Sequence, residues 1–144
     1  MSTQTYASHR RFVPPFHFVL GPMLLLGLIG ACVNLYQSLG DHQRLYSASL
    51  LVVLALAVLM LFFFARIFAL KAQDRAIRAE ENLRHYVLTG KLLNPAITTQ
   101  QVIAIRFAPD TEFVALAERA AKESLTPDAI KQAIKNWRAD TYRV

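Results

Sequence analysis

The stretch LYSASLLVVLALAVLMLFFFA, residues 45–65, contains no Asp, Glu, Lys or Arg, and it decides the fold class. A second uncharged stretch, Phe12–Leu39, precedes it. An α-helix rises about 1.5 Å per residue, so roughly 20 apolar residues cross a hydrocarbon layer about 30 Å thick. Both stretches reach that length. The sequence therefore predicts an all-α membrane protein built on a two-helix transmembrane hairpin that lies in a lipid bilayer.

The charged residues divide the chain into two unlike parts. The only charged residues in positions 12–65 are Asp41 and Arg44, whereas positions 66–144 contain 13 Lys or Arg and 9 Asp or Glu. A chain of 144 residues has room for one membrane unit and one small polar part. The predicted segments are a cytoplasmic N-terminal segment (1–11), transmembrane helix 1 (12–39), an external turn (40–44), transmembrane helix 2 (45–70), a cytoplasmic stalk helix (71–89) and a cytoplasmic helical tail (90–144).

The basic residues near the ends of the apolar stretches predict the orientation. Lys and Arg in short flanking segments are enriched on the cytoplasmic side of a membrane. The flanking basic residues are Arg10 and Arg11 before the first stretch, Arg44 in the connection, and Arg66, Lys71, Arg75 and Arg78 after the second. Both termini are therefore expected in the cytoplasm, with the tip of the hairpin outside.

The second apolar stretch is expected to continue as a helix beyond the membrane. Neither Gly nor Pro occurs from Lys71 to Thr89, and Glu80 precedes Arg84 by four residues, the favourable order for an ion pair on a helix surface. Gly90 then supplies a residue type that commonly ends helices. These features predict one continuous helix to about Leu88, of which residues 71–89 form the stalk.

Three short helices are predicted in the tail, each with a polar residue at its start. The expected capping residues are Thr98 or Thr99 for a helix through Phe107, Asp110 for the second helix, and Thr126, followed by Pro127 at the first helical position, for the third. In the third helix, Ile130, Ile134 and Trp137 fall on one face. Because a tail of this size is marginal as an independent core, these three side chains are predicted to dock on the stalk, the membrane surface or another protein.

Small and amide residues share one side of the first apolar stretch. Gly27 and Ala31 are four residues apart, and Gly30 and Asn34 lie on an overlapping face. Small side chains let membrane helices approach closely, and a buried amide can hydrogen-bond across the contact. The sequence thus predicts a helix-packing face there. The alternative is that Asn34 merely approaches the interface and caps the helix.

Two single residues have a second possible interpretation. His17 is able to ligate a haem or pigment metal from within the bilayer, because a neutral imidazole nitrogen is a common metal ligand. Interfacial hydrogen bonding is the favoured interpretation, and no metal or cofactor is expected. Cys32 follows Ile29-Gly30-Ala31, which is similar to the motif before a lipidated cysteine, but the apolar stretch continues past it. It is interpreted as a small apolar side chain.

The sequence indicates neither nucleic-acid binding nor catalysis. Although the pI is near 9.8, basic residues alternate with acidic ones and gather close to the predicted membrane, where anionic headgroups attract them. Ser124, Asp128 and His85 are a catalytic trio by residue type only, without a nucleophile elbow or phosphate loop. A membrane enzyme is therefore the third hypothesis, and we expect the protein not to be an enzyme.

Five motifs resemble those of an uncharacterised family of short two-span bacterial proteins. They are Tyr6-x-x-His9-x-Arg11-x-x-Pro14-x-Phe16-His17, Asn34-Leu35-Tyr36, Gln73-Asp74-Arg75-x-Ile77-Arg78-x-Glu80-Glu81-x-Leu83-Arg84, residues 101–108 (QVIAIRFA), and Ile130-Lys131-x-x-Ile134-Lys135-Asn136-Trp137-Arg138-x-Asp140. The similarity covers nearly the whole chain. It implies a bacterial inner-membrane protein and brings no functional residues.

The function that these observations favour is that of an accessory or scaffold subunit. Most of the polar motifs fall on the stalk and the last helix, which favours docking of a protein partner, or of a second copy of the chain, through these helices. The alternative is a pigment- or haem-contacting subunit of an energy-transducing complex, in which His17 would be the contact.

Overall fold

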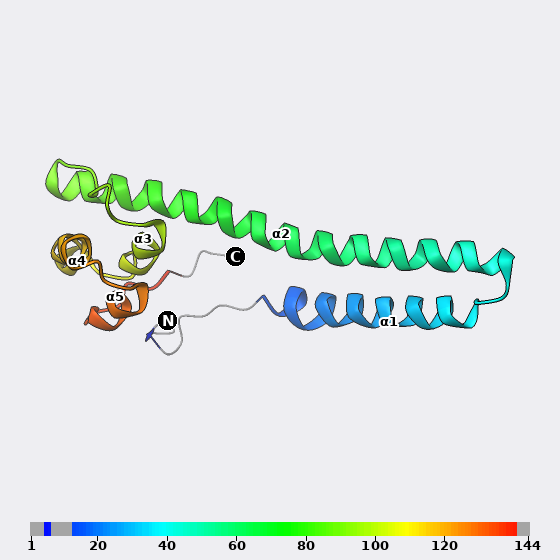
Figure 1. Cartoon of the computed structure of the whole chain (residues 1–144). Coiled ribbons are helices and arrows are strands. Elements are labelled where there is room, and N and C mark those ends of the chain that lie inside the picture. The colour runs from blue at the N-terminus through cyan, green and yellow to red at the C-terminus, as the bar shows by residue number, and fades with distance from the viewer. Residues whose placement is uncertain (1–4, 7–12, 141–144) are drawn as a thin grey trace. The chain divides into compact units, whose positions relative to one another are not determined.

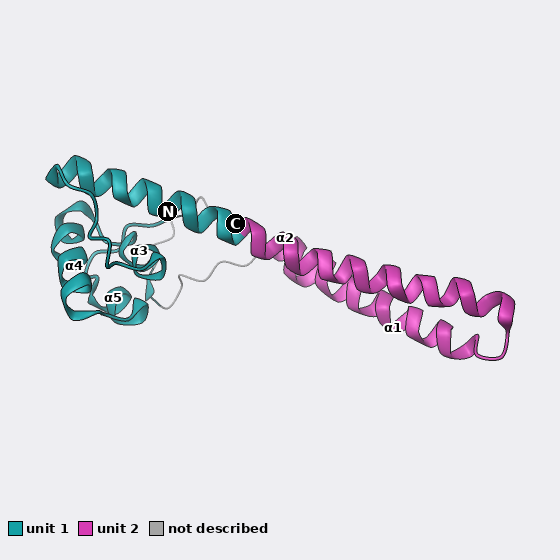
Figure 2. Cartoon of the chain, turned by 45° about the horizontal axis from the view of Figure 1, so that its top comes forward, with its two compact units in different colours: residues 1–10, 70–144 teal, residues 11–69 magenta. Residues whose placement is uncertain are grey.

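The computed structural model describes residues 5, 6 and 13–140, and within them every regular element is a helix (Figure 1). The chain divides into two compact units, residues 11–69 and residues 1–10 with 70–144 (Figure 2). We refer to residues 13–69 as the hairpin and to residues 70–140 as the domain. Most of the predicted N-terminal segment, with Arg10 and Arg11, lies outside the described residues, as does Phe12 at the start of the first predicted span.

The first apolar helix begins as a π-helix and continues as an α-helix. The π-helix η2 covers Pro15–Leu20 and α1 covers Gly21–Gln37. The N–H of Gly21 donates to the carbonyl of Phe16, five residues earlier. Pro22 has no N–H to donate to the preceding turn, and wider turns of this kind accommodate such a gap. The combined helix is 23 residues long and includes an 18-residue window with a mean hydropathy of 2.1, so it is long and apolar enough to cross a membrane.

A short turn leads into a single long helix, α2, His42–Thr89. Gly40 takes the positive φ of +95° that this turn requires, and the Asp41 carboxylate accepts hydrogen bonds from the N–H groups of Gln43 (3.1 Å) and Arg44 (3.3 Å). α2 has 48 residues and contains the second candidate span, with a mean hydropathy of 2.9. Its predicted continuity past residue 71 is confirmed.

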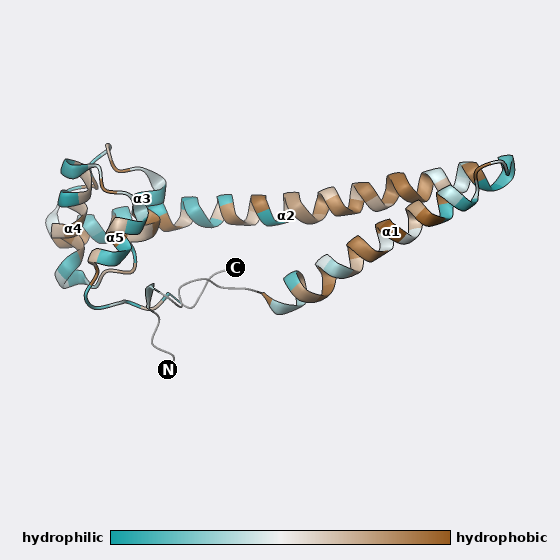
Figure 3. Cartoon of the chain, turned by 60° about the horizontal axis from the view of Figure 1, so that its bottom comes forward, coloured by the Kyte–Doolittle hydropathy of each residue, from teal (hydrophilic) through white to brown (hydrophobic). Residues whose placement is uncertain are grey.

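Within the hairpin, α1 and the first part of α2 meet along a narrow stripe. Phe16 stacks on Phe62 with ring centroids 4.2 Å apart, and Ala48 is 1 % exposed. Half-buried residues recur along the stripe, mostly at every third or fourth position: Leu20 on η2, Leu24, Leu28, Ala31 and Leu35 on α1, and Leu45, Val52, Ala55, Leu59 and Phe62 on α2. Most of the other large apolar side chains of both helices are exposed. Figure 3 shows how hydrophobic residues dominate this part of the chain.

The domain is built from the end of α2 and three short helices, α3 (Thr99–Ile105), α4 (Asp110–Glu123) and α5 (Pro127–Ala133). Its core draws on all of them and on the loop after α2. The buried core residues are Ile77, Leu93, Ile97, Val102, Ala104, Ile105, Phe107, Ala108, Phe113, Leu116, Ala117, Ala120, Ile130 and Ile134. Phe107 and Phe113 are the largest of its fully buried side chains.

The helix starts in the domain agree with the sequence at two of three places. Thr98 caps α3 in a reciprocal box with Gln101, and the Thr126 hydroxyl accepts from the N–H of Ala129 ahead of α5. The prediction for α4 was wrong by one residue: Pro109 is the cap and Asp110 is the first helical residue. The Asp110 side chain is instead engaged in an ion pair with the stalk.

Candidate functional site

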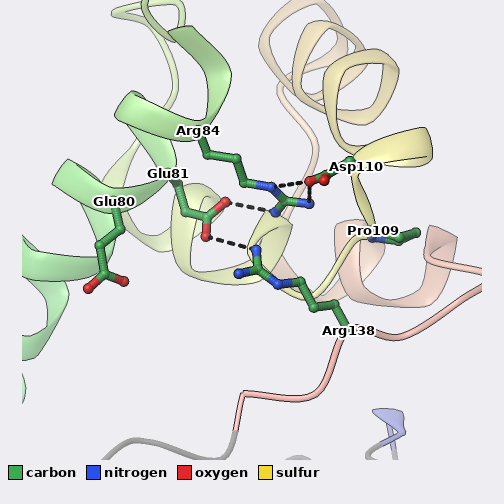
Figure 4. A pocket seen from close by; sticks show the side chains of 6 residues that line it. All are labelled: Glu80, Glu81, Arg84, Pro109, Asp110 and Arg138. Carbon is green, nitrogen blue, oxygen red and sulfur yellow. Dashed lines mark hydrogen bonds and ion pairs between the residues drawn. The ribbon is translucent and has the colours of Figure 1, made fainter. Parts of the chain in front are cut away.

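A charged cluster joins the stalk to the rest of the domain at Glu81. Glu81 is 6 % exposed, and the Arg84 guanidinium donates to its carboxylate at 3.0 Å. The same guanidinium forms an ion pair with Asp110 at 2.6 Å and donates to the backbone carbonyl of Ala108 at 2.8 Å. Arg138, from the segment after α5, lies 3.8 Å from the other Glu81 oxygen (Figure 4). One side chain of the stalk therefore bonds to the turn that precedes α4.

The Arg84 guanidinium also lies over an aromatic ring. Its central carbon is 4.2 Å from the centroid of Phe113, a fully buried residue of α4. A cation over a ring face is attracted by the negative face of the ring, and this contact is stronger where water is excluded. Arg84 thus packs on the hydrophobic core at one face while its edges satisfy two carboxylates.

Burial controls the acidity of the central carboxylate. Removal from water raises the pKa of Glu81 above its usual 4.5, and the hydrogen bond and positive charge of Arg84 partly oppose that rise. The charge on Arg138 opposes it further. Arg84 and Arg138 therefore stabilise the ionised form of Glu81 against the effect of burial.

A hollow of about 560 Å³ borders this cluster. Its lining residues are Glu80, Glu81, Arg84, Pro109, Asp110 and Arg138 (Figure 4). Glu81 and Asp110 both bond to Arg84, so a guanidinium occupies the position between the two carboxylates. The structure gives no group of three or more His, Cys, Asp or Glu residues suited to a metal among the residues it describes. The cluster therefore links three segments that are distant in sequence: the stalk, the start of α4 and the segment after α5.

A second set of polar contacts links residues 135–140 to the residues that follow α3 and to α4. Arg106 is 7 % exposed and pairs with Asp140 at 2.9 Å, while its guanidinium lies 4.3 Å above the Phe107 ring. The N–H of Arg138 donates to the Phe107 carbonyl at 2.7 Å. The Glu112 carboxylate accepts from the N–H groups of Lys135 and Asn136, at 3.0 and 3.2 Å. These bonds hold the extended segment that follows α5.

The predicted docking residues Ile130, Ile134 and Trp137 lie in the chain's own core. Ile130 is 0 % exposed, Ile134 is 6 % exposed, and Trp137 packs on Phe107 with ring centroids 4.9 Å apart. α5 also ends at Ala133, so Trp137 does not share a helical face with Ile130. The sequence left the stalk, the membrane surface and another protein open as docking sites, and the cluster that buries Ile130 and Ile134 includes Ile77 of the stalk. Docking of these side chains on a partner protein stays a prediction.

The predicted packing face of α1 is directed away from α2. A Cβ added at Gly27 or Gly30 would meet nothing within 4 Å, and Asn34 is exposed. Ala31 alone of the four is partly covered. Within this chain the hairpin therefore closes along the half-buried stripe, to which Ala31 alone of the four belongs, and packing of Gly27, Gly30 and Asn34 against another helix stays a prediction.

His17 and Cys32 occupy separate positions on the first helix. His17 is half-buried in η2, and its Nδ1 lies 3.0 Å from the carbonyl oxygen of Val13 and 3.1 Å from the Val13 nitrogen. These contacts lie within one turn of the helix, and the interfacial hydrogen bonding that the sequence favoured stays a prediction. Cys32 is exposed on α1.

The three residues of the possible catalytic trio have other structural roles. His85 is buried and its Nδ1 lies 2.7 Å from the carbonyl oxygen of Lys91, so it holds the loop after α2. Ser124 ends α4 in the left-handed conformation, with φ 51°. Asp128 forms an ion pair with Lys131 on the surface of α5.

The local sequence pattern does not indicate the Glu81 cluster. It pairs Arg84 with Glu80, whereas the structure pairs Arg84 with Glu81 and Asp110. The one available signal was Glu81 itself, an acid flanked by Ile77 and His85 on the face that the domain buries. Asp110 lies 26 positions from Arg84, and Arg138 is more distant still, so no local spacing rule reaches these two partners.

Taken together, the described residues define an all-helical protein in which two helices are long and apolar enough to cross a membrane. Comparison with protein families gives the identity of the group. The chain belongs to a family of unknown function (DUF6526), whose model matches residues 1–144. No curated protein and no solved structure matched the chain.

Proposed function

We propose that this chain is a two-span protein of the bacterial inner membrane, with both termini in the cytoplasm. It acts as an accessory or scaffold subunit of a larger membrane assembly and presents the helical domain to the cytoplasm. The observation that carries this proposal is the exposure of the hairpin.

The exposed side chains of the hairpin are large and apolar. Leu26 is 67 % exposed, Leu54 59 % and Phe63 56 %. In the most apolar 18-residue window, 0 % of the first helix and 6 % of the second is buried, which is the opposite of a core helix in a water-soluble protein. Continuous apolar surface of this extent needs a cover, and a hydrocarbon layer of about 30 Å matches the helix lengths.

Charge supports the proposed orientation. Arg66, Lys71, Arg75 and Arg78 follow the second span, whereas the turn contains only Arg44, which pairs with Asp41 at 3.3 Å. Basic residues close to a span favour the cytoplasmic side. The turn is then external and the domain cytoplasmic.

The charged cluster supports a scaffold role for the domain. Arg84 bonds to Glu81, Asp110 and Ala108, so its donors hold the fold together. Polar groups satisfied in this way define one arrangement of the surrounding helices. A domain of fixed shape next to a membrane is suited to hold a partner protein in place.

Reporter fusions test the orientation directly. An alkaline phosphatase fused after His42 should be active, and the same reporter at the C-terminus should be inactive. A fluorescent protein fused to the C-terminus should fluoresce. Alkaline extraction of the membranes should leave the chain in the pellet. A phosphatase-active C-terminus, or release of the chain by alkali, would overturn the proposal.

A pigment- or haem-contacting role is the second candidate, and one observation favours it. His17 lies on a π-helix, an element that is frequent at functional sites, and its Nδ1 is within hydrogen-bond distance of the Val13 carbonyl. When Nδ1 carries the proton and donates it to that carbonyl, the free lone pair of the imidazole is on Nε2, which is a common metal-ligand atom. Protein purified from its native membrane should then show a visible absorption band that His17→Ala removes. A band-free spectrum would contradict it.

A further inference from the structure

One face of the stalk remains uncovered by the domain. The side chains buried against α3, α4 and α5 include Ile77, Glu81 and His85. On the opposite side of the same helix turns, Leu83 is 63 % exposed and Tyr86 53 % exposed. Three exposed alanines, Ala72, Ala76 and Ala79, extend this outer face along the helix.

The spacing of the outer face is that of a coiled coil. Ala72, Ala76, Ala79, Leu83 and Tyr86 are separated by four, three, four and three residues. This alternation averages 3.5 residues and fits the a and d positions of a heptad, with Ala76 and Leu83 at a. Ile77 and Glu81 then fall at positions b and f, which point away from a partner helix, and these are the positions that the domain buries.

Charges beside the outer face identify the partner. In this heptad Arg75 is at position g and Glu80 is at position e. A parallel pair of identical helices brings g of one copy next to e of the other, five residues further on, so Arg75 meets Glu80 of the second copy twice. Both residues are exposed, and neither has an ion pair within the part of the chain that the structure describes. Glu80 points away from Arg84 and Arg138 (Figure 4).

We propose that a second copy of this chain docks on the outer face of the stalk, as a parallel two-helix coiled coil. The parallel direction rests on the proposed membrane function, because two copies inserted in the same orientation carry their stalks in the same direction. The three alanines allow a close approach of the helix backbones, while Leu83 and Tyr86 supply most of the apolar area. Two heptads are short for a coiled coil, and anchorage in one membrane raises the effective concentration of the second stalk.

Disulfide trapping in membranes tests this interface. Cys32→Ala removes the one native cysteine, and Ala76→Cys or Ala79→Cys then places a thiol in the seam. Oxidation should convert either variant into a covalent homodimer. Ala115→Cys is the matched control, because Ala115 is an exposed alanine on α4 and should remain monomeric. Absence of the homodimer at both seam positions, a disulfide to another protein, or equal dimer from Ala115→Cys would overturn the proposal.

Charge reversal provides a second test in the same membranes. Starting from Ala79→Cys, Arg75→Glu or Glu80→Arg alone replaces two attractive contacts by repulsive ones and should lower the dimer yield about fivefold. The double reversal should restore it. A double variant no better than the single ones would refute the parallel pairing. Reporter fusions on the same variants separate this outcome from a failure of the membrane orientation, which the phosphatase would reveal.

Discussion

The hairpin and the domain contain the same kinds of large apolar side chains and place them in opposite ways. In the hairpin Leu54 is 59 % exposed and Phe63 56 % exposed, whereas in the domain Phe107 and Phe113 are 1 % and 0 % exposed. Water drives apolar side chains together, and hydrocarbon supplies no such drive. The helix α2, His42–Thr89, belongs to both parts: hydrophobic residues dominate its first part, and polar residues are frequent in its second (Figure 3).

Removal of one aromatic ring from each part is expected to give the largest contrast. Phe113→Ala leaves a cavity in the domain core and should lower its free energy of unfolding by about 3–5 kcal/mol. Phe63→Ala deletes the same side chain from an exposed site and should leave the domain unchanged. Urea unfolding followed by the fluorescence of Trp137, the one tryptophan, measures both. If Phe113→Ala and Phe63→Ala changed the free energy of unfolding equally, the domain core would not depend on Phe113.

Loss of the arginine at the centre of the charged cluster should have the next largest effect. Arg84→Met leaves Glu81 buried with only Arg138 nearby and should cost about 2–4 kcal/mol of domain stability. Arg119→Met is the control, since its partner Glu123 is about half exposed and such pairs contribute at most about 1 kcal/mol. The same unfolding experiment compares them. A cost for Arg84→Met no larger than that of the control would show that the cluster is dispensable.

The smallest expected effect depends on pH. Backbone N–H groups of Lys135 and Asn136 hold the pKa of Glu112 below its usual 4.5, with the Lys135 bond the larger cause. The Glu112 carboxylate binds a proton less readily in the native state than in the unfolded state. The stability that ionised Glu112 contributes to the folded domain is therefore fully present above pH 4.5 and is lost as the pH falls through the lowered pKa.

Glu112→Gln tests this dependence. The variant should be less stable than the parent at pH 7, and the difference should shrink in unfolding curves recorded from pH 7 down to pH 3. Glu118→Gln, on the same helix, controls for the loss of a carboxylate. A difference that grows on acidification would contradict the assigned hydrogen bonds.

Features that depend on neighbouring residues could be predicted from the sequence. The two apolar helices follow from the absence of charge, and the end of α2 follows from Gly90, which has φ +72° and whose N–H donates to the Tyr86 carbonyl. The Thr126-Pro127 start of α5 is equally local. In each case the physical cause lies within one helical turn.

Features that depend on distant residues could not be predicted. Ile130 and Ile134 have no obvious cover when the tail is considered alone, and in the structure they are buried in a cluster that also includes Ile77 of the stalk. The pairing of Arg84 with Asp110 spans 26 positions and competes with a local partner, Glu80, that the spacing rule prefers. The sequence of one chain holds no information about which acid is closer in space.

The core of the domain has a consequence for the order of events during synthesis on the ribosome. Ile77 is made sixty residues before Trp137, and both contribute to one core. At elongation rates of about 5–20 residues per second, the stalk waits roughly 3–12 s for its last partner. Throughout that interval the hairpin is already complete, while the inner face of the stalk, with Ile77 and Glu81, remains unshielded. The nascent chain is therefore most vulnerable to proteases and to mispairing in this window, which closes when Arg138 reaches the Phe107 carbonyl.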